Sequence, residues 1–512
     1  MAFTTFAAID VGSNELSLKI FQISKKNGIE EVEHVRHATL LGSDSYKYKK
    51  IRNELVNDTC EVLIQFSEKM KEYGVTDYTA YATSAIREAS NSILILDQIK
   101  LRSGIKVKIL SNSEQRFLCY KAIALKVKAF QKIIEKGTAI VDVGSGSIQI
   151  SLFQHGYLTQ TQNIMLGSLR IRELLSSLEN KTDNYHQLIS EYIDNEMITF
   201  SELFLNEQKI EHIIATGDQL NLFMNIMQKN PGCEPVSVKE LNTFFKTLLE
   251  KPLNELSEHT LAPREQVSLL IPTAMMYHKI FEHSGAKQIY FTDITLCDGI
   301  AAEYAERKEK IQSEHDFNND IIRSASYIAA RYHCNPAHNA NVSYLALSIF
   351  DSIRKLHGLG KRERLLLEIA VILHSCGDFI DLSHSRENSY NIIMSTEIIG
   401  LSHQEREMVA QLVRCTPETF PKFSLDMDGT KKDVYIKLSK LFAIFSIANA
   451  LDKSHKQKFS DVKISLKQNI LMITTNTVED ITLEYGLFDD KANFFEEVYG
   501  IKPCIKQKRR FT

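Results

Sequence analysis

The sequence predicts an α/β fold built from two related halves, followed by a helical region and a small α+β end. Up to about residue 307, short apolar runs typical of strands alternate with helical patterns. An internal repeat marks the two halves. Phe6–Phe21 and Ala139–Leu152 each contain an apolar strand, an Asp-Val-Gly-Ser turn and a return strand. Strands and helices that alternate in two repeats indicate an α/β architecture with a cleft between the halves.

Each predicted element of the first half is bounded by a change in the apolar pattern or by capping residues. Polar residues from Ser111 to Gln115 precede a helical apolar pattern and are typical of a helix start. The predicted elements are a strand, a turn and two strands in residues 1–40, a helix at Ile51–Tyr73, a strand at Thr79–Thr83, a helix from Ser84, a strand at Lys106–Leu110 and a helix to about Phe130.

The second half begins at Thr138, and the composition changes after Arg307. Residues 308–320 are polar and indicate a linker or an exposed helix end, and residues 321–413 have a helical pattern that is broken at glycines. The remaining predicted elements are strands at Ala139–Val143, Ile148–Leu152, Glu211–Ala215 and Gln288–Phe291, a helix in Thr292–Ala305, and strands at Val462–Leu466, Ile470–Thr475 and Ile481–Tyr485. We therefore predict domains at residues 1–135, 136–307, 321–424 and 425–512.

Composition and charge exclude several classes of protein. A hydrophobic fraction of 44% is typical of a globular chain, and a net charge of −3 gives no general affinity for nucleic acid. No apolar run reaches the roughly 20 residues that cross a bilayer, and the N-terminus has no charged region before a cleavable apolar core. The eight cysteines are scattered without a Cys-x-x-Cys pair, which favours reduced thiols in a cytoplasm over disulfides or a zinc site. We expect a cytoplasmic protein that binds neither membrane nor nucleic acid.

The two repeated turns have the chemistry of phosphate-binding loops. Glycines let backbone N–H groups approach a ligand, and serine and asparagine add hydrogen-bond donors. Asp10 and Asp142, at the strand ends, would repel a phosphate unless a hard cation such as Mg²⁺ lay between them. Neither turn has the GxGxxG or GxxxxGK[ST] pattern of nucleotide-binding loops. The alternative is two ordinary hairpins with Gly/Ser turns, and the matched pair of turns argues against it.

Eight segments along the chain carry a resemblance to a known family. They are AAIDVGSNELSLKI, YATSAIREASN, KVKILSNSEQRFLCYKAI, AIVDVGSGSIQISLF, IIATGD, RYHCNPAHNANVSYLALSIFD, HGLGKRERLLLEIAVILH and GLSHQEREMVAQLVR. In this order they resemble the exopolyphosphatase / guanosine pentaphosphate phosphohydrolase family over most of the chain. The resemblance implies two actin-like (ribonuclease H-like) domains with the active site in the cleft between them, a helical domain related to the HD phosphohydrolases, and a small α+β C-terminal domain.

The same resemblance implies a reaction and its residues. The reaction is Mg²⁺-dependent removal of the terminal phosphate from polyphosphate, or of the γ-phosphate from guanosine pentaphosphate, and the family suggests a homodimer. Matched residue by residue, the two aspartates near the metal and phosphate are Asp10 and Asp142, the first phosphate loop is Gly12, Ser13 and Asn14, the second is Gly144, Ser145, Gly146 and Ser147, and the family's Thr-Ser-x-x-Arg segment ends at Arg87, which is able to bind phosphate bidentately.

Several residues depart from the family's pattern. The family's catalytic base, a Glu at the start of a helix, aligns with Gln115, and Glu114 is its neighbour. Gln149 stands where a Glu ends the second loop, beside the implied metal. The third loop, usually Ala-Ser-Gly-Thr, offers Thr216 and Gly217 for phosphate binding. It then has Asp218, which adds negative charge where phosphate should lie.

The helical region lacks the residues of an HD metal site. His374-Ser375 replaces the expected His-Asp pair, and Cys415-Thr416 replaces a later Tyr-His pair. Such a site needs imidazoles and carboxylates as ligands, so we predict no metal there. His374, on an apolar helix, is then expected to be a core residue.

The substitutions leave three functions open. A glutamine cannot take a proton from water, although in phosphoryl transfer a glutamine can position the water instead. Glu114 could take over only if its helix turned by the roughly 100° that separates neighbouring residues. The first function is a phosphoanhydride hydrolase whose activity the glutamines could weaken. The second is a degenerate paralogue that binds polyphosphate or guanosine penta- or tetraphosphate as a sensor. The third is a small-molecule kinase of the actin-like superfamily, which would need an adenosine pocket.

Overall fold

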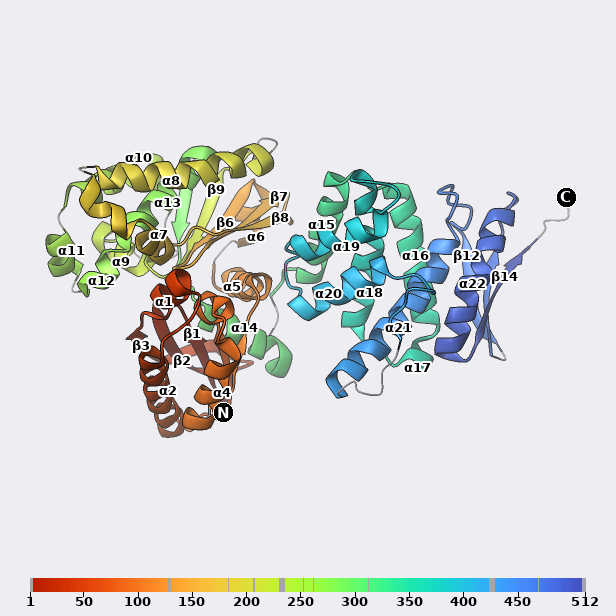
Figure 1. Ribbon diagram of the computed structural model, residues 1–512, viewed down its shortest axis with the longest axis horizontal. Coiled ribbons are helices and arrows are strands. Elements are labelled where there is room, and N and C mark those ends of the chain that lie inside the picture. The colour runs from red at the N-terminus through yellow and green to blue at the C-terminus, as the bar shows by residue number, and fades with distance from the viewer. Residues whose placement is uncertain are drawn as a thin grey trace. The chain divides into compact units, whose positions relative to one another are not determined.

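The chain divides into two compact units, Met1–Asp316 and Phe317–Thr512 (Figure 1). The first unit holds two mixed sheets with helices, and the second holds helices and a three-stranded sheet. The computed structural model describes residues 3–127, 130–182, 184–205, 208–229, 235–251, 253–260, 262–311, 313–422, 429–467 and 469–508.

The first sheet has the strand order β3-β2-β1-β4-β5. Strand β2 runs antiparallel to β1 and β3, whereas β4 runs parallel to β1 and β5. The elements of this half are β1 (Thr4–Val11), β2 (Glu15–Ser24), β3 (Gly28–Ala38), α1 (Leu41–Tyr48), α2 (Asn53–Glu72), β4 (Asp77–Ala82), α3 (Ser84–Glu88), α4 (Ser92–Ser103), β5 (Val107–Ile109), α5 (Asn112–Lys126) and α6 (Phe130–Glu135).

Strand β1 is buried on both faces because helices cover both sides of its sheet. Ala7 and Ile9 belong to a core that includes residues of α2 and α4. Phe6 and Ala8 pack in a second core, with residues of α5 and of α14 (Leu296–Glu309). Successive side chains of a strand point to opposite faces, so a doubly covered strand requires a continuous apolar run. This packing fixes the strand and the turn that follows it.

The second sheet repeats the topology of the first. Its order is β10-β11-β9-β6-β7-β8, in which β6, β7 and β8 form an antiparallel meander and β9 runs parallel to β6. Strands β1 to β4 have the same arrangement. The elements are β6 (Thr138–Val143), β7 (Ile148–Gln154), β8 (Tyr157–Ile164), α7 (Ser168–Leu175), η1 (Ser176–Lys181), α8 (Tyr185–Phe200), η2 (Ser201–Leu205), β9 (His212–Thr216), α9 (Leu220–Met227), β10 (Val236–Ser237), α10 (Val238–Glu250), α11 (Leu253–Thr260), α12 (Arg264–Val267), α13 (Leu270–Ser284), β11 (Gln288–Phe291) and α14.

Helix α14 ties the end of the second half to the sheet of the first. It contacts β1, β2 and α5, and Leu296, Ile300 and Tyr304 lie in the core that these elements share. A Cβ atom at Gly299 would lie 2.5 Å from the backbone of Leu118 in α5. The two helices can approach this closely because residue 299 is a glycine.

The second unit packs long helices together beside a small sheet. The sheet has the order β12-β13-β14, with β12 antiparallel and β14 parallel to β13. Among the helices in the described ranges, none is both long enough and apolar enough to cross a membrane. The elements are α15 (Phe317–Arg331), α16 (Pro336–Ser352), α17 (Arg354–His357), α18 (Lys361–Leu373), η3 (Cys376–Phe379), α19 (Ser385–Ser395), α20 (His403–Arg414), α21 (Gly429–Ala450), β12 (Val462–Lys467), β13 (Ile470–Thr475), α22 (Thr482–Tyr499) and β14 (Lys502–Gln507).

The prediction of a strand at Ile481–Tyr485 is wrong, because this segment enters helix α22. A five-residue alternation of apolar and polar residues is too short to separate a strand from the first turn of a helix. The buried residues Glu484, Phe488, Ala492 and Phe495 recur every three or four positions, as one face of a helix requires. The third strand of the sheet is β14 instead.

Candidate active site

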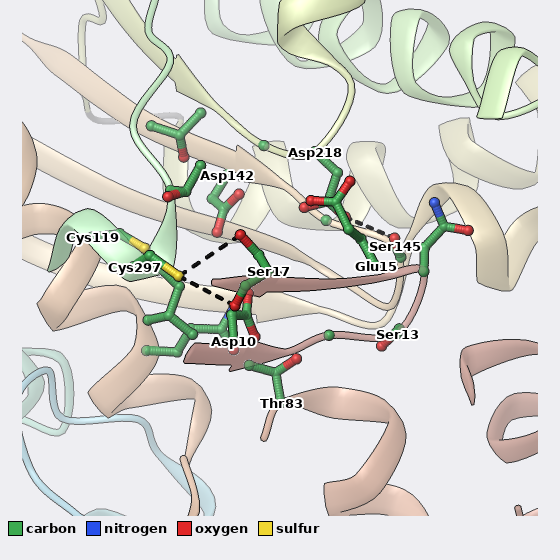
Figure 2. Close-up of a pocket in the computed structure, with 18 of the residues that line it drawn as sticks. Asp10, Ser13, Glu15, Ser17, Thr83, Cys119, Asp142, Ser145, Asp218 and Cys297 are labelled. Atoms are coloured by element: carbon green, nitrogen blue, oxygen red, sulfur yellow. Dashed lines mark hydrogen bonds between the residues drawn. The ribbon is translucent and has the colours of Figure 1, made fainter. Parts of the chain in front are cut away.

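One cleft of the first unit is lined by both halves (Figure 2). Its lining comes from the β1–β2 turn, the β6–β7 turn, the loop after β9, the starts of α3 and α5, and the loop before α14. Glu114 is the one predicted site residue that does not line it. The predicted residues that do are Asp10, Gly12, Ser13, Asn14, Arg87, Gln115, Asp142, Gly144, Ser145, Gly146, Ser147, Gln149, Thr216 and Gly217.

The two repeated turns have the same hydrogen bond. We call them loop 1 (Gly12–Glu15) and loop 2 (Gly144–Ser147). In loop 1 the N–H of the glycine donates to the Glu15 carbonyl at 3.0 Å, and in loop 2 it donates to the Ser147 carbonyl at 3.1 Å. A Cβ atom at Gly12 would lie 2.6 Å from the Glu15 oxygen, so the turn needs a glycine there. The two halves therefore present equivalent loops to one cleft.

A third loop, which we call loop 3 (Thr216–Asp218), follows β9 at the same sheet edge as loop 2. Gly217 has a φ of 142°, and a Cβ atom there would lie 2.4 Å from the Val143 carbonyl oxygen. The path of loop 3 is thus one that favours glycine. Ser145 Oγ donates to Asp218 Oδ2 at 2.7 Å and joins loop 2 to loop 3.

Asp10 and Asp142 occupy equivalent ends of the two central strands. Burial, followed by the charges of Asp218, Glu15 and Asp142, raises the pKa of Asp10 well above its ordinary value. Burial, followed by the charge of Asp218, raises the pKa of Asp142 to about 7. The Oδ1 atom of Asp10 is buried and has no hydrogen-bond partner among the described residues. These carboxylates repel one another, and a bound cation would relieve that repulsion.

Gln149 lies directly opposite Asp142 on the neighbouring strand, so the two side chains share a face of the sheet. Its side chain is buried, and its Oε1 atom has no hydrogen-bond partner in the described part of the chain. A buried oxygen of this kind calls for a ligand, an ion or a water. Together with Asp10 and Asp142, it offers the oxygen donors that a hard cation such as Mg²⁺ prefers.

Among the residues that the structure describes, the side chains of the cleft do not form a metal site of three protein ligands. Within the described ranges, no group of three or more His, Cys, Asp and Glu residues is placed to hold a metal ion. This does not conflict with Mg²⁺, which usually takes one or two carboxylates and completes its shell with waters and substrate oxygens.

Helix α5 directs Gln115 into the cleft and uses Glu114 as a cap. Glu114 Oε2 accepts hydrogen bonds from the N–H and the Oγ of Ser111 at 3.0 and 2.8 Å, and the Glu114 N–H donates to Ser111 Oγ at 3.2 Å. This reciprocal pair is a capping box. The glutamate next to Gln115 is therefore already engaged in starting the helix.

Arg87 lines the cleft, but its guanidinium is bound to the start of α5. It donates to the Leu110 carbonyl at 2.6 Å and to Asn112 Oδ1. In this arrangement Arg87 positions the helix that carries Gln115. Its binding of phosphate stays a prediction from the resemblance.

Two residues that the sequence did not indicate connect loop 1 to loop 2. Tyr46, on α1, donates to Ser13 Oγ at 2.7 Å. Arg170, on α7 of the other half, donates to the Gly146 carbonyl at 2.7 Å, and its guanidinium carbon lies 4.0 Å from the centre of the Tyr46 ring. Arg170 also forms an ion pair with Glu88 at 2.6 Å. We call these contacts the α1–α7 bridge.

Asp298, at the start of α14, has a structural role. Burial alone would raise the pKa of Asp298, but the ammonium groups of Lys19 and Lys126 lower it to about 2. The two ion pairs measure 2.9 and 2.5 Å. The carboxylate also accepts hydrogen bonds from Thr295 and caps α14.

The second unit has a histidine cluster that the sequence did not predict. His338 Nδ1 lies 2.8 Å from Asp452 Oδ2, and His338 Nε2 lies 3.2 Å from His374 Nε2. The ring of His455 stacks on His338. Burial lowers the pKa of His374 to about 4. His374, expected to be a core residue, lies beside a second histidine and lines a cavity of about 890 Å³.

Comparisons with known proteins agree with this architecture. A model of the Ppx/GppA phosphatase family matches residues 20–308, and a model of Ppx/GppA phosphatase, domain III, matches residues 322–487. A guanosine-5'-triphosphate,3'-diphosphate pyrophosphatase of Pseudoalteromonas translucida is 20% identical over 451 residues, which is 86% of each chain. A bifunctional 3-dehydroquinate synthase/phosphatase of Fusobacterium nucleatum is 24% identical over 187 residues, and the match spans 28% of that protein and 35% of this chain.

Solved structures share the fold of the first unit. An exopolyphosphatase from Cytophaga hutchinsonii superposes with a TM-score of 0.52 at 17% identity, covering 59% of this chain and 97% of that one. A Ppx/GppA family member from Aquifex aeolicus gives 0.50 at 19% identity, covering 62% and 100%. The predicted α/β fold with two actin-like halves is confirmed. Because the first family model spans more than half of the sequence, the chain belongs to the Ppx/GppA phosphatase family.

Proposed function

We propose that the protein is a phosphoanhydride hydrolase that releases the terminal phosphate of polyphosphate or guanosine pentaphosphate in the cleft of the first unit. The observation that carries the proposal is the pair of equivalent loops 1 and 2, which line one cleft from both halves. Linked phosphate groups offer oxygens to two such loops at once. Relatives named for each substrate, an exopolyphosphatase and a guanosine pentaphosphatase, support this substrate class.

Three groups of lining residues have roles in this proposal. Asp10, Asp142 and Gln149 would hold Mg²⁺, because the unpartnered buried oxygens of Asp10 and Gln149 and the neighbouring carboxyl of Asp142 suit a hard cation. When bound, the ion would neutralise negative charge on the phosphate oxygens. Loops 1 and 2, with Thr216 and Gly217, would bind the phosphate. Gln115 would orient the attacking water without taking its proton, so we expect slow turnover.

A second function is favoured by one specific observation. The carboxamide of Gln115 lines the cleft while Glu114 is engaged in the capping box. A cleft that lacks a general base could still bind phosphates and serve as a sensor of polyphosphate or of guanosine penta- or tetraphosphate. In that case binding would be retained and hydrolysis lost.

Two measurements on the purified full chain separate these functions. The first is phosphate release from long-chain polyphosphate and from guanosine pentaphosphate with Mg²⁺, and the second is calorimetric binding of both compounds. A hydrolase releases phosphate in proportion to protein and stops when EDTA is added. A sensor binds without release. Absence of both binding and release would contradict both functions.

We further propose a homodimer in the cytoplasm, on the basis of the family resemblance. Sedimentation equilibrium of the purified chain tests the dimer directly. A monomer at all concentrations in the micromolar range would contradict it.

A further inference from the structure

Asp218 accepts a hydrogen bond from the Ser145 hydroxyl of loop 2. Its carboxylate accepts the hydrogen bond of Ser145 Oγ at 2.7 Å. Figure 2 shows this hydrogen bond as a dashed line, with the side chain of Glu15 beside it. A phosphate oxygen would accept the same hydrogen bond. The Asp218 carboxylate therefore competes with phosphate for the hydrogen bond of Ser145.

The charge of Asp218 reaches both central aspartates. After burial, it is the largest cause that raises the pKa of Asp10 and the pKa of Asp142. The backbone of loop 3 holds it there, because Gly217 has a φ of 142° and passes close to the Val143 carbonyl. Asp218 is thus the charge that acts most strongly on both central aspartates.

The lining of the cleft does not neutralise this charge. Arg36 forms an ion pair with Glu15 at 2.8 Å, and Arg87 is bound to the start of α5. Burial lowers the pKa of His34 to about 4, so this imidazole is neutral at pH 7. Among the described lining residues, the acidic side chains of Glu15, Asp218 and Asp293 outnumber the two arginines even when the raised pKa of Asp10 and of Asp142 keeps those carboxyls protonated. An entering anion meets an excess of negative charge.

We propose that Asp218 makes anion binding in this cleft conditional on a divalent cation. Without the cation, the Asp218 carboxylate accepts the hydrogen bond of the Ser145 hydroxyl and repels phosphate. Once the carboxylates are neutralised, the hydroxyl is free to donate to a phosphate oxygen. The inference rests on the proposed function, because both concern the same cleft. It deepens that function by naming the bound form of the substrate, which is the phosphate anion together with its divalent cation.

The test is calorimetric binding of inorganic tripolyphosphate, first in EDTA and then with excess Mg²⁺. The proteins are the wild type, Asp218→Asn, Asp218→Ser and the matched control Asp293→Asn. In EDTA we expect both Asp218 variants to bind about tenfold or more tightly than the wild type, because one close negative charge is gone. With Mg²⁺ the difference should fall below about threefold. Asp293 is exposed, so solvent screens its charge and its variant should gain less than about threefold in EDTA.

The outcomes separate this inference from the proposed function. Equal affinity of the wild type in EDTA and in Mg²⁺, or no gain by either folded Asp218 variant in EDTA, would overturn the role of Asp218 and leave the proposed function standing. A gain by Asp293→Asn as large as that of Asp218→Asn would overturn it too, since the effect would then be one of overall charge. If no protein binds tripolyphosphate under either condition, the proposed function fails, and the inference with it.

Discussion

At the scale of single residues, the amide of Gln115 decides how fast the cleft can work. The substitution Gln115→Glu replaces this amide with a carboxylate that can accept a proton from water. General-base catalysis raises reaction rates by about 10²–10⁴-fold. We expect phosphate release from polyphosphate to rise at least about tenfold. The measurement is the kcat for phosphate release with saturating Mg²⁺.

Glu114→Ala is the matched control for this substitution. It removes the capping box of α5 and should cost about 0.5–2 kcal/mol of stability, seen as a lower melting temperature. It should not accelerate release. A Gln115→Glu protein no faster than the wild type, or a folded Glu114→Ala protein without any release, would contradict these roles.

The raised pKa of Asp142 should make the stability of the metal-free fold depend on pH. Burial raises its pKa from the ordinary 3.8 to about 7, so the folded protein binds this proton more tightly than the unfolded chain does. The side chain therefore destabilises the fold increasingly as pH rises from 4 to 7. In EDTA, Asp142→Asn should melt above the wild type at pH 8, with a smaller difference at pH 5. A difference that is the same at both values would show that Asp142 titrates normally.

The residues of the two turns could be predicted because each turn is a local pattern. The Asp-Val-Gly-Ser repeat placed Asp10, Asp142 and both loops in one cleft. The capping role of Glu114 was also visible in Ser111-Asn112-Ser113-Glu114, which has the spacing of a capping box. The contact of Arg87 with Leu110 could not be predicted, because it depends on how two separate segments fold together.

At the scale of secondary-structure elements, the α1–α7 bridge holds loop 1 and loop 2 in register. Arg170→Ala should increase hydrogen exchange of the loop 1 amides, although Arg170 belongs to the other half. It should also lower kcat for phosphate release by about tenfold with a smaller change in KM, because misplaced loops hold the phosphate badly.

Arg172→Ala is the control for the bridge, since Arg172 lies on the same helix and pairs with Glu173 at 2.9 Å. It should leave exchange of the loop 1 amides unchanged. Equal exchange in Arg170→Ala and the wild type would mean that the bridge does not position loop 1.

Some strands were predicted to the residue. Strands β11 and β13 begin and end where the pattern placed them, at Gln288–Phe291 and Ile470–Thr475. The segment Ile481–Tyr485 was assigned wrongly, because five residues fit the period of a strand as well as that of a helix. The buried residues that identify the helix lie further along α22.

At the scale of the whole molecule, the duplicated topology explains why one cleft has two equivalent loops. The sequence revealed the duplication through its two turns. It did not reveal that α14 packs on the first sheet, because the close approach of Gly299 to Leu118 joins residues far apart in the chain. The same holds for the histidine cluster of the second unit, which gathers His338, His374 and Asp452 from three elements.

We propose hydrolysis of a terminal phosphoanhydride in the cleft of the first unit. Its most direct test is phosphate release from long-chain polyphosphate with Mg²⁺, comparing the wild type with Asp142→Ala. We predict slow release by the wild type and loss of at least about 99% of it in a folded Asp142→Ala protein, since one orienting group at the reacting centre is worth about 10²-fold or more. Undiminished release by Asp142→Ala would place the chemistry elsewhere, and no release by the wild type together with no release by Gln115→Glu would contradict the hydrolase.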